Sequence, residues 1–384
     1  MSPTLGSVRL GFRGPRTDHG RLSAALVSVL KFHPALRSIF RRDWQGGWEC
    51  LIRPECDYEL LKDESRDFSV SARGPEYSLF SAHHVDTDDH SELLIEMNHL
   101  IVDAISLHIF IKTLNERLES LDCGSTDDGY VNWLFEQDDL IGSARHFQLA
   151  EFWHRKFEAC GMFPELPFRG CIDGDRVVSS WTTLVRTRVL PKFVDYVARS
   201  RLTIPAICLA LLANSFRDLY GSEVLVFHLA AANRKVRTKS TVGWLANTVA
   251  VRVEPSWGCS LEELARKILM ELLTASDHAE LPLNLVVPDL YPNTGVRAPR
   301  IFVNFEDRRV LSGASPTKFH RIEPPRDFVA GPSNVIAEFA LCDEGLEIYL
   351  LGDAAVASND DFVNVRSRLI EYVSVLESGN HLQE

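Results

Sequence analysis

The chain has 384 residues, 45% of them hydrophobic and 24% charged, and a formal net charge of −12. This composition is ordinary for a globular protein, and the length indicates two domains. The excess of acidic residues argues against nucleic acids, which bind clustered Lys and Arg, and against anionic membranes. With no apolar run of about 18 residues, no signal-peptide pattern and eight dispersed cysteines, we expect a cytoplasmic protein with reduced thiols.

Strand and helix patterns alternate through the first half of the chain. A strand is predicted over residues 8–12, and a helix begins at Asp18, a suitable N-cap. Two hairpins follow, over 36–52 with a Gly46-Gly47 turn and over 77–99 with the polar turn 86–89. The remaining patterns of this half are helical and cover residues 106–120, 130–140 and 143–160.

The second half begins after a stretch rich in Pro and Gly, residues 161–175, which we interpret as a linker. An apolar helix is predicted to end at Gly221. We expect strands over 177–190, 224–229, 246–253, 300–305, 335–341 and 346–350, and helices from Pro191 and over 204–220, 260–276 and 360–376. Each half mixes a sheet with helices, which predicts an α/β (α+β) fold with an N-terminal lobe, residues 1–165, and a C-terminal lobe, residues 166–384.

The run Asn98 to Ser106 stands between a predicted strand and a predicted helix. A neutral imidazole such as that of His99 can accept a proton from an amine or a hydroxyl. The short polar side chains of Asp103 and Ser106 suit a helix start, where they accept from free backbone N–H groups. Taken alone, the run is also compatible with a loop histidine beside an N-cap.

Two groups of His and Asp suggest a metal site at first glance: His83-His84-x-Asp86 and Asp88-Asp89-His90. Both fall at a predicted hairpin tip, where alternate side chains point to opposite faces. We therefore interpret them as a solvated turn and expect no metal site.

The run at 98–104 resembles the His-His-x-x-x-Asp-Gly motif of condensation domains of nonribosomal peptide synthesis, within the chloramphenicol acetyltransferase-like superfamily. Further segments resemble the family's motifs in the same order: residues 33–40, 242–248 with the following Val251-Arg252, and 301–305. The resemblance covers about the whole chain. Three positions depart from the motifs: Asn98 replaces the first histidine, Ala104 the glycine, and Phe32 an arginine. The family's N-terminal motif is not found before the first strand.

The resemblance implies two related lobes in a V with a central tunnel and no bound cofactor, and the length of the chain predicts a free-standing enzyme. His99 would deprotonate or orient an acceptor that attacks a thioester, carried either by the phosphopantetheine arm of an acyl- or peptidyl-carrier protein or by CoA. Asp103 would hold the loop through a salt bridge, for which Arg37 is the predicted partner. The predicted tunnel residues are Asn98, Ala104, Trp244, Asn247 and Asn304.

The basic loop, residues 234–239, stands out in an acidic protein. It is either a solvated loop or a contact, through Arg234, Lys235 and Arg237, for a phosphopantetheine phosphate or an acidic carrier protein.

Three functions remain open at this point. The first is an acyltransferase of specialised metabolism that joins a thioester-bound acyl or peptidyl group to a small-molecule amine or hydroxyl. The second is a degenerate domain that docks a carrier protein or recruits a partner enzyme. The third is a tunnel repurposed for cyclisation.

Overall fold

The computed structural model describes residues 6–54, 58, 60–62, 78–120, 126–158, 165–168, 191–290, 300–307, 318–322, 333, 335–342, 345–352 and 356–378. They form two compact units: unit 1 contains residues 1–141, 234–246 and 310–329, and unit 2 contains the rest. This corrects the single boundary predicted at residue 165. The chain leaves unit 1 earlier and returns to it twice, because residues 234–246 bond to the start of a unit 1 helix and residues 320–322 pair with the first strand.

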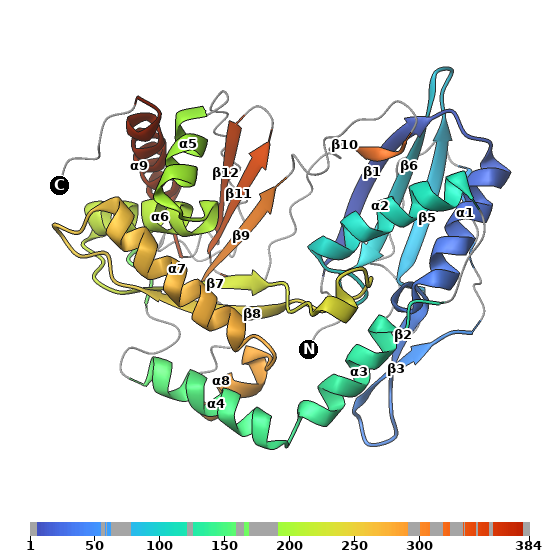
Figure 1. The fold of residues 1–384 in the computed structure, drawn as a ribbon, viewed down its shortest axis with the longest axis horizontal. Helices are drawn as coiled ribbons and strands as arrows, with labels where there is room; N and C mark the ends of the chain where they lie inside the picture. Colours follow the sequence, from blue (N-terminus) through green and yellow to red (C-terminus); the bar gives the residue numbers. More distant parts are fainter. Residues whose placement is uncertain are drawn as a thin grey trace. The chain divides into compact units, whose positions relative to one another are not determined.

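Unit 1 contains a five-stranded sheet of order β10-β1-β6-β5-β4 and a separate β2–β3 hairpin. Helices α1 and α2 pack against the sheet and bury the apolar core of the unit (Figure 1). The side chain of Asp18 caps α1 by accepting the N–H of Arg21 at 3.1 Å, as the sequence predicts. The elements of this unit are β1 (Ser7–Pro15), α1 (His19–Phe32), the 3₁₀ helix η1 (Pro34–Arg37), β2 (Ser38–Arg42), β3 (Trp48–Ile52), β4 (Leu61–Lys62), β5 (Phe80–Asp86), β6 (His90–Asn98), α2 (Ala104–Glu119), α3 (Gly129–Leu140), η2 (Val236–Thr238) and β10 (His320–Ile322).

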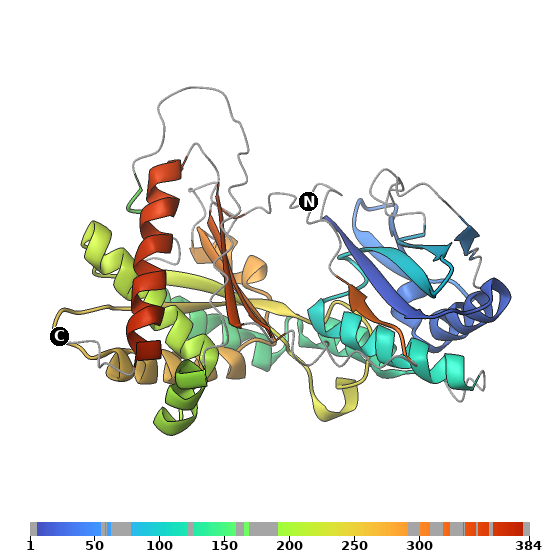
Figure 2. The ribbon, with the colours of Figure 1, turned by 90° about the horizontal axis from the view of Figure 1, so that it is seen from above.

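Unit 2 contains the second five-stranded sheet, of order β12-β11-β9-β7-β8. Figure 2 shows the red C-terminal helix beside the orange and red strands of this sheet. The helix α6 is apolar almost all round and buried, and it ends at Gly221, whose φ of 67° is the left-handed conformation that glycine adopts without strain. The elements are α4 (Ala144–Phe157), α5 (Pro191–Ser200), α6 (Ile204–Tyr220), β7 (Leu225–Ala231), β8 (Asn247–Val253), α7 (Leu261–Asp277), α8 (Leu283–Leu290), β9 (Ile301–Asp307), β11 (Val335–Cys342), β12 (Gly345–Gly352) and α9 (Asn359–Ser378).

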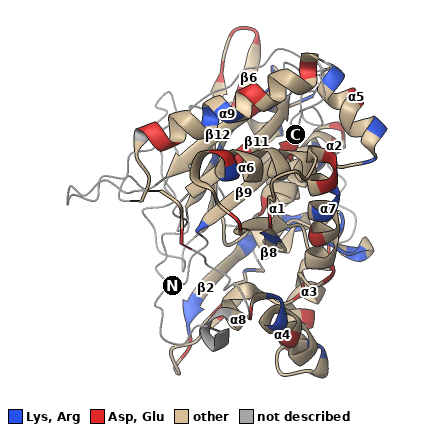
Figure 3. Ribbon diagram, turned by 90° about the vertical axis from the view of Figure 1, so that its left-hand side faces the viewer, with Lys and Arg blue, Asp and Glu red and all other residues tan. Residues whose placement is uncertain are grey.

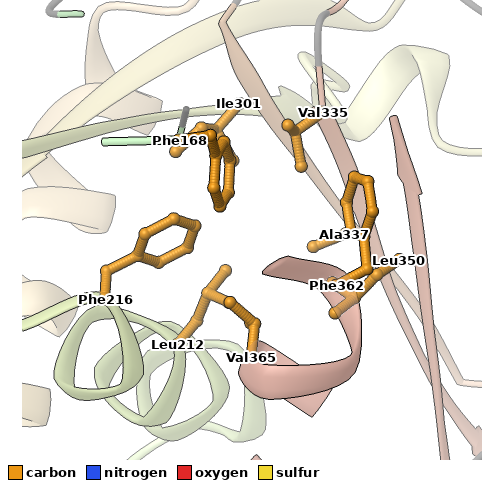
Figure 4. A pocket seen from close by; sticks show the side chains of 9 residues that line it. All are labelled: Phe168, Leu212, Phe216, Ile301, Val335, Ala337, Leu350, Phe362 and Val365. Atoms are coloured by element: carbon orange, nitrogen blue, oxygen red, sulfur yellow. The ribbon is translucent and has the colours of Figure 1, made fainter. Parts of the chain in front are cut away.

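A small apolar cavity lies where α6 and α9 cover one face of the unit 2 sheet (Figure 4). Its space is only about 10 Å³, enough for roughly one water-sized sphere, and every lining side chain is apolar. We therefore assign it to core packing rather than to ligand binding. It is lined by Phe168, Leu212, Phe216, Ile301, Val335, Ala337, Leu350, Phe362 and Val365.

Most predicted elements are confirmed to within a few residues. Helix α8 and the short edge strands β4 and β10 were not predicted, because their sequences carry little periodic pattern. The predicted strand 177–190 and most of the predicted linker lie outside the described residues. Charged residues of both signs alternate along surface helices such as α7 and α9 (Figure 3). No single described helix is long and apolar enough to span a membrane. Among the described helices, only α5 and α6 taken together, across a bend of 105°, have the length and apolar composition of a membrane span.

Gly14→Ala is expected to lower the free energy of unfolding by about 1–3 kcal/mol, because it overpacks the unit 1 core. A Cβ at Gly14 would lie 2.6 Å from ring atoms of the buried Phe319. That ring cannot retreat easily, since the Asn115 side chain bonds both the N–H and the carbonyl of Phe319, at 2.8 and 2.9 Å. Urea unfolding measures the effect. Gly6→Ala, where a Cβ meets nothing within 4 Å, is the control, and equal stability of both variants would contradict the packing argument.

His228, which is 1% exposed on β7, makes unit 2 sensitive to acid. Desolvation lowers its pKa to about 4, although a hydrogen bond with the backbone of Ile301 opposes the shift. The unfolded chain binds this proton near pH 6.5 and the folded chain only near pH 4, so stability is full above pH 6.5 and is lost as the pH falls toward 4. We expect this histidine to lower the free energy of unfolding by about 3 kcal/mol between pH 6.5 and pH 4. His228→Leu should flatten the pH dependence of urea unfolding, and an unchanged slope would refute the assignment.

Candidate functional site

The candidate site is the loop between β6 and α2, residues 99–103. Asn98 ends β6 with its side chain buried, and its Oδ1 accepts the N–H of Leu100 at 2.9 Å. The carbonyl of the same residue accepts the N–H of Ile101 at 3.0 Å. An amide that bonds to the backbone two residues ahead stabilises a tight turn. Asn98 therefore shapes the loop that presents the next residue, His99.

The side chain of His99 is exposed at this turn. Its Nδ1 lies 3.3 Å from the carbonyl oxygen of Val102. Because a carbonyl oxygen only accepts, Nδ1 carries the hydrogen, and the lone pair of the neutral ring is on Nε2. Although the side chain reaches solvent, the surrounding protein desolvates part of the ring and so lowers the pKa of His99. The Val102 carbonyl and the charge of Asp103 only partly oppose this shift. The neutral, proton-accepting form is therefore favoured at neutral pH.

Asp103 is buried and accepts hydrogen bonds through both carboxylate oxygens. As N-cap of α2, its Oδ1 accepts the N–H of Ser106 at 2.9 Å, and it also accepts from Arg234 Nη2 at 2.7 Å. Its Oδ2 accepts the N–H groups of Leu245 and Ala246 at 3.1 and 3.2 Å. One carboxylate thus ties the start of α2 to the returning segment 234–246.

Ser106 is a second centre of this network, and it is fully buried. Its hydroxyl lies 2.7 Å from Asp103 Oδ1 and 2.8 Å from the Gly243 carbonyl, either of which accepts its single proton. The hydroxyl oxygen accepts from the Gly243 N–H and from Arg234 Nη2, both at 3.0 Å. From the sequence, Ser106 is predicted only to stand at a helix start, because no local pattern reveals a partner 137 residues away.

Arg37 is not the partner of Asp103, which corrects the prediction. It ends η1, and its Nε donates to the carbonyl of Leu30 in the last turn of α1 at 3.0 Å. Its Nη1 donates to the carbonyl of Arg53, just after β3. Carbonyls at a helix C-terminus lack partners within the helix and attract a cation. Arg37 therefore joins α1 to the β2–β3 hairpin.

The true partner, Arg234, was predicted to contact a carrier protein. Its side chain is only 7% exposed, so its guanidinium is not available to a macromolecular partner. Desolvation lowers the pKa of Arg234, and the nearby Asp103 opposes this shift. The other two predicted contacts, Lys235 and Arg237, are exposed, and both form ion pairs with Glu136 on α3, the lysine at 3.9 Å.

The remaining predicted tunnel residues are Ala104 and Trp244 in unit 1 and Asn247 and Asn304 in unit 2. Ala104 is exposed at the first position of α2, and Trp244 is half-buried in unit 1. In unit 2, the Asn247 amide nitrogen donates to the carbonyls of Ala279 and Glu280, at 2.8 and 3.3 Å. Asn304 is half-buried on β9 and, by strand alternation, points away from the face that α6 and α9 cover.

The predicted solvated turn at His83 and His84 needs a correction. Both residues lie within β5 and are buried, because this strand continues to Asp86. The ring of His84 stacks on that of His19, with Nδ1 atoms 3.2 Å apart. Within the described residues, no group of three or more His, Cys, Asp or Glu side chains is arranged to hold a metal ion.

Comparison with known proteins identifies the family to which this chain belongs. The family model of the condensation domain matches residues 10–306. A linear gramicidin synthase of Brevibacillus parabrevis is 26% identical over 342 residues, which cover 84% of this chain. The chain spans only 4% of the length of that relative, so it matches one part of a much larger protein.

Solved structures share the fold along nearly the whole chain. The starter condensation domain of rhizomide synthetase RzmA, a mutant form solved in complex with C8-CoA, superposes with a TM-score of 0.75, with 16% identity over 98% of this chain and 90% of that chain. The X-domain from teicoplanin biosynthesis, solved in complex with OxyB, gives a TM-score of 0.74 and 16% identity over 99% and 91%. At these identities the likeness establishes the fold.

Proposed function

Since the chain belongs to the condensation domain family of nonribosomal peptide synthetases, we propose that it is an acyltransferase that joins a thioester-bound acyl or peptidyl group to an amine or a hydroxyl. The donor is a phosphopantetheine thioester on a carrier protein or an acyl-CoA. A starter condensation domain of the same fold was solved in complex with C8-CoA, which supports the second form of donor.

The observation that carries this proposal is the state of His99. Its Nδ1 hydrogen is directed to Val102, its pKa is lowered, and its side chain is exposed, so a neutral Nε2 is available to a substrate. As general base, Nε2 takes the proton of the acceptor N–H or O–H while the acceptor attacks the thioester carbonyl. The C–S bond then breaks, and the thiolate takes the proton back from the imidazolium. The products are an amide or ester and a free thiol.

The other site residues act indirectly, by positioning the imidazole of His99. Asp103, Ser106 and Arg234 hold the start of α2, and Asn98 shapes the turn, so the imidazole is positioned before the substrate arrives. Trp244, Asn247 and Asn304 stay candidates for substrate contact, as does Ala104, which adds a methyl group where the family motif has glycine.

A second function, recruitment of a partner enzyme or carrier without catalysis, is favoured by one specific observation. The first motif histidine is replaced by Asn98, whose amide cannot act as a base and whose oxygen is already used by the Leu100 N–H. The X-domain of teicoplanin biosynthesis, which has the same fold, was solved in complex with OxyB. Retention of the second histidine favours catalysis over recruitment.

The test is mass spectrometry of products formed from CoA-linked and carrier-linked acyl donors with a panel of amines and alcohols. We expect a condensed product whose mass equals that of the donor's carboxylic acid plus the acceptor minus one water. A product with no added acceptor would indicate the cyclase instead. If no donor or acceptor is consumed while a carrier protein still binds, the recruitment function replaces the acyltransferase.

A further inference from the structure

The basic loop presents an unusual combination of side chains at the surface of unit 1. Three cations, Lys235, Arg237 and Lys239, are exposed on a protein whose net charge is −12. Between them, Val236 is 85% exposed. Glu136 on α3 forms ion pairs with the first two cations and offsets part of their charge. The loop is therefore a cationic surface with an apolar side chain at its centre.

The backbone of the basic loop is held in place from both ends. The Thr238 hydroxyl accepts the N–H of Lys235 at 2.9 Å, and the Thr238 carbonyl accepts the N–H of Thr241 at 3.1 Å. Before the cations, Arg234 bonds to Asp103, and after them Thr241 donates to Asp127 at 3.2 Å. A surface held in this way loses little conformational entropy when a partner binds.

The same anchor connects the loop to the candidate site. Arg234 is the residue before the exposed cations, and its carboxylate partner Asp103 is four residues after His99. Any macromolecule that binds the basic loop is therefore attached to the network that positions the histidine.

The chemistry of the loop distinguishes a protein partner from a free phosphate. A phosphate group would gain from the cations but would make no contact with the apolar side chain of Val236. An acidic protein surface with a small apolar depression would pair with the cations and bury the valine as well.

We propose that residues 235–239 are a docking surface for the acidic face of a carrier protein. The inference rests on the proposed function, because it assumes that an acyl or peptidyl carrier takes part. It places the contact on the protein body of the carrier and not on its phosphopantetheine arm. Electrostatic attraction then speeds encounter, and Val236 fixes the position of the partner.

The test is an NMR titration of a ¹⁵N-labelled carrier domain from the linear gramicidin synthase of Brevibacillus parabrevis with the unlabelled protein. The variant Lys235→Ala/Arg237→Ala/Lys239→Ala is expected to raise Kd roughly tenfold, since three exposed ion pairs are lost. Val236→Ser is expected to raise Kd about threefold through the lost apolar contact. The matched control is Arg199→Ala/Arg266→Ala/Lys267→Ala, which removes three exposed cations from unit 2 and should leave Kd unchanged.

Apo and holo carrier are compared to locate the contact. If the triple variant weakens the binding of both forms equally and leaves CoA binding unaffected, the contact is on the protein body of the carrier. If the triple variant weakens the binding of holo carrier and of CoA but not of apo carrier, the proposal is overturned in favour of a phosphate contact. The proposal also fails if the wild type leaves the carrier spectrum unchanged, or if the triple variant binds like the wild type. If the wild type binds the carrier through the loop but forms no product, only the acyltransferase proposal is refuted.

Discussion

Replacing Asp103 by alanine is expected to lower the free energy of unfolding by about 3–5 kcal/mol. The change leaves the guanidinium of Arg234, which is 7% exposed, without its counter-ion. It also removes the acceptor of the N–H groups of Ser106, Leu245 and Ala246, and buried donors without acceptors are costly. The segment 234–246 should detach from the start of α2, and any activity should be lost together with the fold.

Urea unfolding followed by circular dichroism measures this loss. The control is Glu49→Ala, whose ion pair with Arg41 spans 3.1 Å between largely exposed side chains and should contribute less than about 1 kcal/mol. The double variant Asp103→Asn/Arg234→Met should be more stable than the sum of the single changes predicts, because it leaves no buried charge unpaired. A loss below about 1 kcal/mol in Asp103→Ala would show that the network does not hold unit 1 together.

His99→Ala, in contrast, should lower turnover roughly 10²–10⁴-fold, the range of general base catalysis, while leaving stability nearly unchanged. The imidazole is exposed, and its hydrogen bond joins it to the Val102 carbonyl at the same turn, so its removal leaves no cavity in the core. Product formation from the best donor and acceptor pair measures the effect, and urea unfolding checks the fold.

The pH profile provides an independent readout of the same role. Because desolvation lowers the pKa of His99, the neutral base persists below pH 6.5, where an unperturbed histidine begins to charge. Turnover should therefore rise with pH through this lowered pKa and stay level across neutral pH. Asn98→Ala, which loosens the turn without removing a base, should lower turnover but keep the shape of the profile. A profile that His99→Ala retains would assign the base elsewhere.

Helices and central strands could be predicted because their signals are local. The capped, amphipathic α1, the apolar α6 with Gly221 after it, and the two hairpins of unit 1 each follow from side chains a few positions apart. Short edge strands could not be predicted in this way. Strand β10 has only three residues, and its pairing with β1 depends on Phe319 and Ile322, which fill the space beside Gly14 and Gly11.

The sequence by itself determined that His99 and Asp103 stand at a strand-to-helix turn, since a short polar run between two periodic patterns specifies that turn. Only the tertiary structure decided what holds the turn in place. Arg37 is drawn instead to the carbonyls at the end of α1, and Arg234, in a loop whose composition is typical of a solvated segment, becomes the buried counter-ion. Ion-pair partners are chosen by burial and by competing acceptors in three dimensions, and neither has a signature in the spacing of residues along the chain.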